Sequence, residues 1–191
     1  MKLEFPLFTL PLVLLLLVVQ CQSQTAGGGS QREQSSFGTE EVPGIPLVKR
    51  PVPVPNAALQ ILNEDVDVKG CLSDTPLLPS DSFTSLFIGS DIHLDGHSES
   101  DLIVVPVPDS GCFHSATGIS VFWVFRGTGE QYELVLKALG NGLGILKTKY
   151  NGYRIIETGI IRQAGRKYTT ATFRFDGKHY QKYQEKTQNR Q

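Results

Sequence analysis

The sequence predicts a mainly β protein of the α+β kind, with an antiparallel β meander of about six to seven strands and one or two short N-terminal helices. Two observations predict this fold class. After Asp101, apolar and polar residues alternate with a period of two, as they do in half-buried strands. Glycine-containing turn dipeptides interrupt this alternation at short intervals, as they do in a series of hairpins.

The first 23 residues have the layout of a signal peptide. Lys2 is followed by an apolar run from Phe5 to Val19 and then by small and polar residues. The run is shorter than the roughly 20 residues of a membrane-spanning helix. We therefore expect residues 1–23 to be removed on export, to the periplasm or the extracellular space.

A second interpretation of this segment involves Cys21. The sequence Val-Val-Gln-Cys that ends at Cys21 resembles a lipoprotein signal, which would anchor the protein to a membrane through an acylated cysteine. Gln20 stands where such signals have a small residue. The sequence leaves soluble export and lipid anchoring both open.

Three further segments follow the signal. Residues 24–56 are rich in Gly, Gln and Ser and then in Pro, which predicts a flexible tether that becomes extended toward its end. Residues 57–183 are the predicted β-rich globular domain. Residues 184–191 are polar, and we expect them to form a disordered tail.

Two helices and seven strands are expected in the domain. The helices are predicted at residues 56–63 and 80–88, from apolar residues spaced by three and four. The strands are expected at residues 101–106, 119–126, 131–138, 143–149, 153–161, 168–175 and 178–183. The segment 121–125 is apolar at every position, which predicts a central strand covered on both faces, with the N-terminal helices on one of them.

Turn signals set the expected strand pairing. Asn151-Gly152 and Asp176-Gly177 favour two-residue hairpin turns, and Gly140-Asn141-Gly142 is expected to be another connection between neighbouring strands. A two-residue turn at Asp176-Gly177 would place Phe173 opposite Tyr180.

Two cysteines remain after the signal segment. Cys71 and Cys112 form an even pair, which in an oxidising compartment is most simply a disulfide. Two buried free thiols are the alternative.

Charge is spread unevenly along the chain. Residues 1–136 carry 6 Lys or Arg and 16 Asp or Glu, whereas residues 137–191 carry 12 and 3. The simpler interpretation is that the opposite charges lie on solvated faces and attract each other within one fold. The alternative is a basic surface for an anionic partner.

Residues 93–105, HLDGHSESDLIVV, look like a metal-binding loop that leads into a buried strand. They resemble the FG-GAP or VCBS-type repeat, whose loop reads roughly D-x-D-G-D-G-x-x-D-L and binds calcium through its first, third, fifth and ninth residues. The resemblance places His93, Asp95, His97 and Asp101 at these four positions. It covers about 13 residues in one copy, so it implies a loop-to-strand unit and no propeller.

The chemistry of these four residues argues against calcium. Calcium prefers six to eight oxygen ligands, and two of the carboxylates are replaced by imidazoles. We expect no cofactor here, and a loop whose Asp side chains accept hydrogen bonds from backbone amides. Calcium, or zinc bound by His93, Asp95, His97 and Asp101, is the alternative.

The β region also resembles uncharacterised exported bacterial proteins that join such a loop to a β meander. The resemblance rests on the segments WVFRGTGEQYELVL, LKTKYNGYRII and TTATFRFDGKHY. It brings no established activity, and it implies an exported module of the cell envelope.

No catalytic motif stands out in the sequence. It contains no His-Glu-x-x-His, no Gly-x-Ser-x-Gly, no P-loop and no dinucleotide fingerprint. Cys112 and His114 are close in sequence, but a disulfide would remove the thiol nucleophile. We expect a non-enzymatic binding module whose partner is an envelope protein or glycan and not a nucleic acid. The alternatives are a metal-binding protein and an inhibitor of a cell-wall hydrolase.

Overall fold

The structure is a computed structural model, and it describes part of the chain. The described residues are 32–38, 51–74, 82–96, 100–107, 113, 115, 118–162 and 165–189, with the backbone alone for residues 32–38. Their elements are β1 (Arg32–Gly38), α1 (Asn56–Glu64), α2 (Val66–Asp74), the 3-10 helix η1 (Phe83–Leu86), β2 (Phe87–Ile92), β3 (Asp101–Pro106), β4 (Ser120–Thr128), β5 (Gln131–Gly140), β6 (Gly142–Tyr150), β7 (Tyr153–Arg162), β8 (Lys167–Phe175) and β9 (Tyr180–Asn189).

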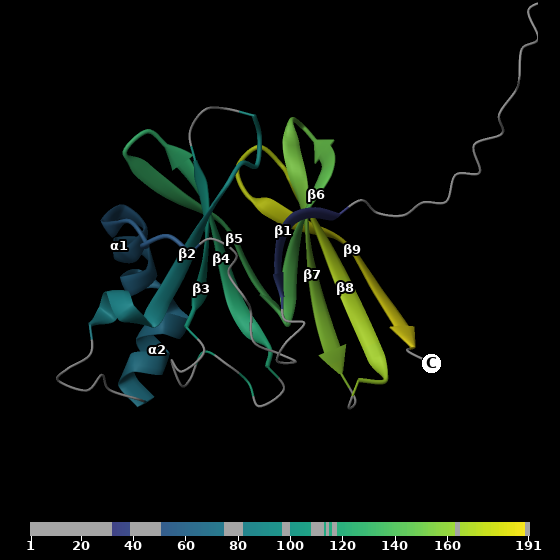
Figure 1. The fold of residues 1–191 in the computed structure, drawn as a ribbon, viewed down its shortest axis with the longest axis horizontal. Helices are drawn as coiled ribbons and strands as arrows, with labels where there is room; N and C mark the ends of the chain where they lie inside the picture. Colours follow the sequence, from purple (N-terminus) through teal and green to yellow (C-terminus); the bar gives the residue numbers. More distant parts are fainter. Residues whose placement is uncertain are drawn as a thin grey trace, which may run out of the picture.

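The strands form two antiparallel sheets. Sheet A has the order β1-β6-β7-β8-β9, and sheet B has the order β2-β3-β4-β5. Figure 1 shows the sheets next to each other, with α1 and α2 on the side of sheet B that faces away from sheet A. The predicted mainly β class with two short helices is confirmed. The single meander of six to seven strands is not, because the described strands divide between two sheets.

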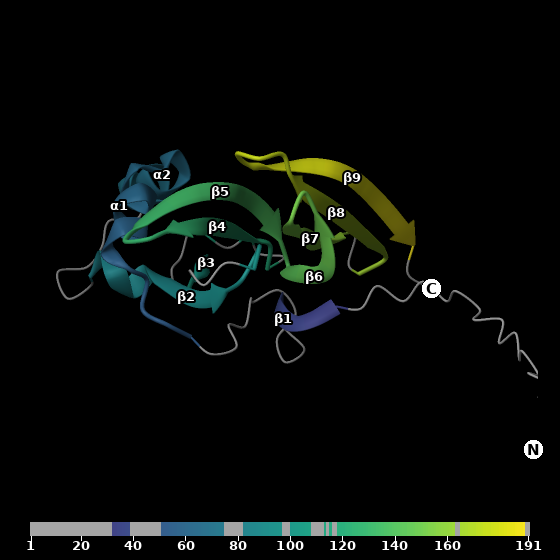
Figure 2. The ribbon, with the colours of Figure 1, turned by 90° about the horizontal axis from the view of Figure 1, so that it is seen from above.

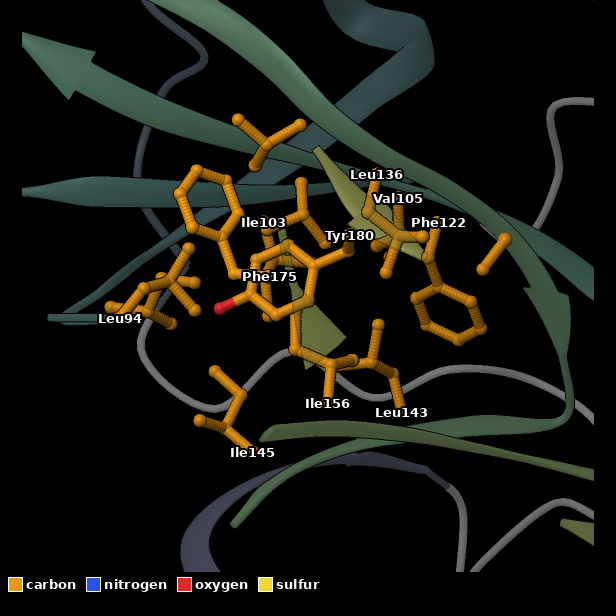
Figure 3. Packing of buried hydrophobic residues seen from close by; sticks show 14 residues of the cluster. Leu94, Ile103, Val105, Phe122, Leu136, Leu143, Ile145, Ile156, Phe175 and Tyr180 are labelled. Atoms are coloured by element: carbon orange, nitrogen blue, oxygen red, sulfur yellow. The ribbon is translucent and has the colours of Figure 1, made fainter. Parts of the chain in front are cut away.

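Sheet B is covered on both faces. Along β3, Ile103 and Val105 pack into the core between the sheets, whereas Leu102 and Val104 pack against the helices. Alternation along a strand sends neighbouring side chains to opposite faces, so a strand covered on both sides is apolar throughout. β4 follows the same rule, which confirms the prediction for residues 121–125. Figure 3 shows the core between the sheets.

The helices α1 and α2 are joined by Asp65. The Asp65 Oδ1 atom accepts hydrogen bonds from the Asp67 and Val68 amides at 2.9 and 3.2 Å, which caps the start of α2. The Lys137 ammonium on β5 binds the same carboxylate at 2.7 Å. Burial alone would raise the pKa of Asp65, but the hydrogen bonds from Lys137 and Val68 outweigh it and lower that pKa. Asp65 therefore fastens both helices to sheet B.

The predicted helix at residues 80–88 is wrong. Residues 83–86 form a single 3-10 turn, and Phe87 begins β2, which pairs with β3. The spacing of apolar residues here suits a helix or a buried strand, and pairing with the apolar β3 decides for the strand.

The connection at Gly140-Asn141-Gly142 is not a hairpin turn. Asn141 is the one residue between β5 and β6, which belong to different sheets, so the chain changes sheet here. The corner is fixed to β7, because the Asn141 amide donates to the Gly159 carbonyl at 2.7 Å and the Asn141 side-chain oxygen accepts from the Ile161 amide at 2.7 Å.

The two predicted Asx-Gly hairpins have different outcomes. Asn151 and Gly152 both have positive φ, and Tyr150 pairs directly with Tyr153, which confirms a two-residue turn. The β8–β9 loop has four residues instead of two, because Asp176 Oδ1 accepts hydrogen bonds from the Lys178 and His179 amides at 2.8 Å each. Phe175 is therefore the residue opposite Tyr180.

The predicted tether and the predicted tail both contain strand residues. β1 lies within the predicted tether and pairs with β6, and Val52 forms an isolated bridge with Gly89 on β2. β9 continues to Asn189, so residues 184–189 are strand and not tail. The residues of β9 after Tyr180 are exposed and mostly polar, so they lack the alternation of apolar and polar residues by which a strand is predicted. Figure 2 shows β1 and β9 on opposite sides of sheet A. Residues 1–23, including Cys21, lie outside the described residues, and no helix in the described part is long and apolar enough to cross a membrane.

Replacing Asn141 by Ala should lower the free energy of unfolding by about 1–3 kcal/mol, because the Ile161 amide loses its acceptor at a buried corner. Asn63→Ala, at an exposed position near the end of α1, is the matched control and should change stability by less than about 0.5 kcal/mol. Urea unfolding of both variants measures the difference. Equal stabilities would show that the corner does not depend on Asn141.

Candidate functional site

The loop that resembles a calcium site is organised around Asp101. This side chain is buried, with 2% of its surface exposed, at the start of β3. Its Oδ2 atom accepts a hydrogen bond from the Leu94 amide at 2.7 Å, and its Oδ1 atom accepts one from the Gly127 amide on β4 at 3.1 Å. The prediction that this carboxylate binds backbone amides is confirmed.

The same loop connects the two sheets. The Leu94 side chain is fully buried in the core between them. The Leu94 carbonyl accepts a hydrogen bond from the Arg154 amide on β7 at 2.6 Å, and the Lys149 ammonium on β6 donates to the Asp95 carbonyl. Residues 94–95 therefore join sheet B, through Asp101, to sheet A.

The structure places the four predicted metal ligands differently. His93 is exposed, Asp95 is half-buried, and Asp101 is buried with a backbone donor on each oxygen. His97 lies outside the described residues. Among the residues that are described, no group of three His, Cys, Asp or Glu side chains is arranged to hold a metal. The four-residue metal site stays a hypothesis.

Burial is the main influence on the Asp101 carboxylate. It raises the pKa of Asp101 above the usual value, although the hydrogen bonds from Leu94 and Gly127 act in the opposite direction. Asp95 raises this pKa further and His93 lowers it, since both lie close enough to act through their charges.

The structure describes one of the two cysteines of the predicted disulfide. Cys71 is buried on α2, and its side chain has a partner and is not free. Cys112 lies outside the described residues, but Phe113, next to it in sequence, packs in the same cluster as Cys71. The disulfide between Cys71 and Cys112 stays a prediction, and the position of Phe113 supports it.

The charge asymmetry of the sequence follows the two sheets. Residues 51–140, which include the helices and sheet B, carry 12 Asp or Glu and 3 Lys or Arg. Residues 142–189, which include β6 to β9 of sheet A, carry 3 and 10. The described ion pairs of Arg126 with Glu133 and of Lys137 with Asp65 lie within the acidic part, whereas Lys182 pairs with Glu185 on β9.

Sheet A has a polar face that we call the outer face, on the side of β8 and β9 opposite Phe173 and Phe175. Phe173 and Phe175 pack into the core between the sheets, so the alternate residues of β8 point the other way. On β8 these outer-face residues are half-buried, and their partners on β9 are exposed. They are Tyr168, Thr170, Thr172 and Arg174 on β8, opposite Gln188, Lys186, Gln184 and Gln181 on β9.

Arg174 is the most unusual member of the outer face. Its guanidinium carbon lies 3.4 Å from the centre of the Tyr183 ring and 4.8 Å from the centre of the Tyr150 ring. In the described part of the chain, Arg174 forms no ion pair, and its Nε atom has no hydrogen-bond partner. Tyr150 and Tyr183 keep 43% and 59% of their surface exposed. A basic group is therefore held against two aromatic rings, without an acidic partner in the described residues.

The sequence did not identify this cluster. Its residues come from β6, β8 and β9, and Tyr183 has no direct partner on β8 because the register shifts between Thr172 and Phe173. Such a bulge leaves no local signal in the sequence. The basic C-terminal region was the one available indication.

Comparisons of this chain with protein families, with curated proteins and with solved structures found no match. The geometry of the chain itself therefore carries the functional argument.

Replacing Asp101 by Ala should lower the free energy of unfolding by about 1–3 kcal/mol, because two backbone amides lose their acceptor. Asp101→Asn should cost less, since its amide oxygen keeps one bond and no charge has to be buried. Asp91→Ala, at an exposed position of β2, is the matched control.

The loss of stability caused by Asp101→Ala should also be larger near pH 4 than at pH 7. Because burial raises the pKa of Asp101, the native state binds this proton more tightly than the unfolded chain, and the stability so gained is lost as the pH rises through the native pKa. Urea unfolding at both pH values measures this, and a deficit that shrinks on acidification would contradict it.

Calcium or zinc at micromolar concentration should leave the melting temperature unchanged, since a ligand stabilises only through binding to the native state. The double variant His93→Ala with His97→Ala should melt close to the unmodified chain. Differential scanning calorimetry with and without each metal makes the comparison. A rise of several degrees with zinc that the double variant abolishes would establish the metal site instead.

Proposed function

We propose that this chain is an exported, non-enzymatic binding module of the bacterial cell envelope, and that it binds an envelope protein or glycan through the outer face of sheet A. One observation carries the proposal. Sheet B is packed on both faces, whereas the outer-face side chains of β8 are half-buried and those of β9 are exposed.

The chemistry of the outer face suits recognition. Thr and Gln side chains provide hydrogen-bond donors and acceptors, and the tyrosines provide flat apolar surface with a polar tip. The core between the sheets is built from the opposite face, so these outer residues are not needed for its packing. Side chains that are dispensable for the core are available for a partner.

The arrangement of reactive side chains supports a role without catalysis. His93 lies in the loop before β3, His179 lies in the β8–β9 loop, and Cys71 is buried on α2. These three side chains belong to separate elements of the described part of the chain. The signal-like segment at residues 1–23 supports export.

Co-sedimentation with insoluble bacterial envelope fragments tests the proposal. The purified chain should enter the pellet, and Lys186→Glu on the outer face should reduce the bound fraction by at least about threefold, because it reverses a charge at the contact. Lys69→Glu makes the same change at an exposed position of α2 and should have no such effect. If the chain stays in the supernatant, or if both variants behave alike, the proposed function is wrong. A hydrolase inhibitor would instead bind a purified wall hydrolase and reduce its activity.

A further inference from the structure

We propose that Arg174, held against Tyr150 and Tyr183, binds the carboxylate groups of an acidic polysaccharide. The inference rests on the proposed function and names its ligand class. It depends on three properties of Arg174, Tyr150 and Tyr183, which we call the Arg174 cluster. These are a guanidinium without an acidic partner in the described residues, exposed aromatic rings beside it, and a basic sheet around it.

The first property is the preorganisation of Arg174. A guanidinium stacked on aromatic rings keeps its planar donor edge in a defined orientation, which lowers the entropy lost when a ligand binds. The guanidinium carbon lies over both rings, 3.4 Å from the centre of Tyr183 and 4.8 Å from that of Tyr150. The Nε atom is buried, so the terminal N–H groups of Arg174 are the donors that remain for a ligand. Those donors match the two oxygens of a carboxylate.

The second property is the exposure of the rings. Tyr150 and Tyr183 are among the large hydrophobic residues that remain exposed in the described part of the chain. The face of an aromatic ring is electron-rich, so it attracts the weakly positive C–H groups of a sugar as well as a cation. A sugar ring could therefore contact a tyrosine while its carboxylate reaches Arg174.

The third property is the surrounding charge. Residues 142–189 carry 10 Lys or Arg against 3 Asp or Glu, and Lys186 stands exposed on the outer face opposite Thr170. Such a field raises the local concentration of a polyanion and orients it over the sheet. Thr170, Thr172 and Gln184 add uncharged partners for hydroxyl groups.

A polysaccharide fits this surface better than a protein does. Protein interfaces depend on a central apolar anchor that fills a pocket, and the outer face of β8 and β9 offers Thr, Gln and Lys around one Arg-Tyr cluster. A chain of hydroxylated, carboxylated rings matches those groups along the length of the two strands.

The test uses polygalacturonate as the probe and its fully methyl-esterified form as the uncharged match. Isothermal titration calorimetry with the purified chain should show binding to polygalacturonate and none to its methyl-esterified form. The titration is done at about 50 mM salt, where charge screening is weak. Arg174→Gln should weaken binding at least about tenfold, because it removes a charge-assisted paired contact. Arg174→Lys should weaken it by about threefold or more, since the charge remains without the planar fork.

Arg166→Gln is the matched control. It removes the same charge from an exposed turn at the other end of β8, and it should change affinity by less than about twofold. Melting temperatures of all three variants confirm that they are folded. If Arg166→Gln and Arg174→Gln lowered the affinity for polygalacturonate equally, the effect would come from net charge alone, and the proposal would be wrong.

Two further outcomes separate this inference from the proposed function. If polyglutamate or single-stranded DNA binds as tightly as polygalacturonate, the surface recognises polyanions in general and the polysaccharide assignment is wrong. If polygalacturonate does not bind while envelope binding still requires Lys186, the inference fails and the proposed function stands.

Discussion

A single residue, Asn141, connects β5 to β6, and this short link constrains the rest of the structure. A hairpin between neighbouring strands needs at least two loop residues, so the chain cannot fold back and passes instead into a second sheet. A Cβ atom on Gly140 would lie 2.9 Å from the Gly142 carbonyl oxygen, which explains the glycine beside the corner. Among the described elements, the helices, sheet B and β1 precede Asn141, and β6 to β9 of sheet A follow it. The acidic and basic halves of the sequence thereby become two sides of one molecule.

The Asp101 loop fastens the sheets at the other end of β6. Asn141 precedes Gly142 at the start of that strand, whereas Lys149, near its end, contacts the loop at Asp95. Two sheets joined at one corner alone could separate at their other end. The buried Leu94 side chain and the hydrogen bond from the Arg154 amide to the Leu94 carbonyl oppose this. The Asp101 carboxylate thus has a structural task in the described residues, because it accepts hydrogen bonds from the Leu94 and Gly127 amides.

Local patterns predicted the elements that depend on local forces. β3 matches its predicted bounds, the Asn151-Gly152 turn was recognisable from its dipeptide, and the apolar segment in β4 indicated coverage on both faces. The failures have a common cause in long-range contacts. Helix α2 contains two valines and a glycine, which are poor helix formers, and it depends on the cap at Asp65 and on packing against sheet B. The corner at Asn141 looked like a turn because its glycines fit either geometry.

The candidate sites divide in the same way. The 93–101 loop is contiguous, so its residues could be named from the sequence and Asp101 could be assigned its bonds to amides. The Arg174 cluster depends on the register of β8 and β9. A two-residue turn at Asp176 would place Tyr183 opposite Thr170, four residues along the strand from Arg174. The amides of Lys178 and His179 bind the Asp176 carboxylate, lengthen the loop to four residues, and shift β9 by two positions. That shift, together with the bulge at Tyr183, brings the ring onto the guanidinium, so the chemistry of the outer face follows from the length of one loop.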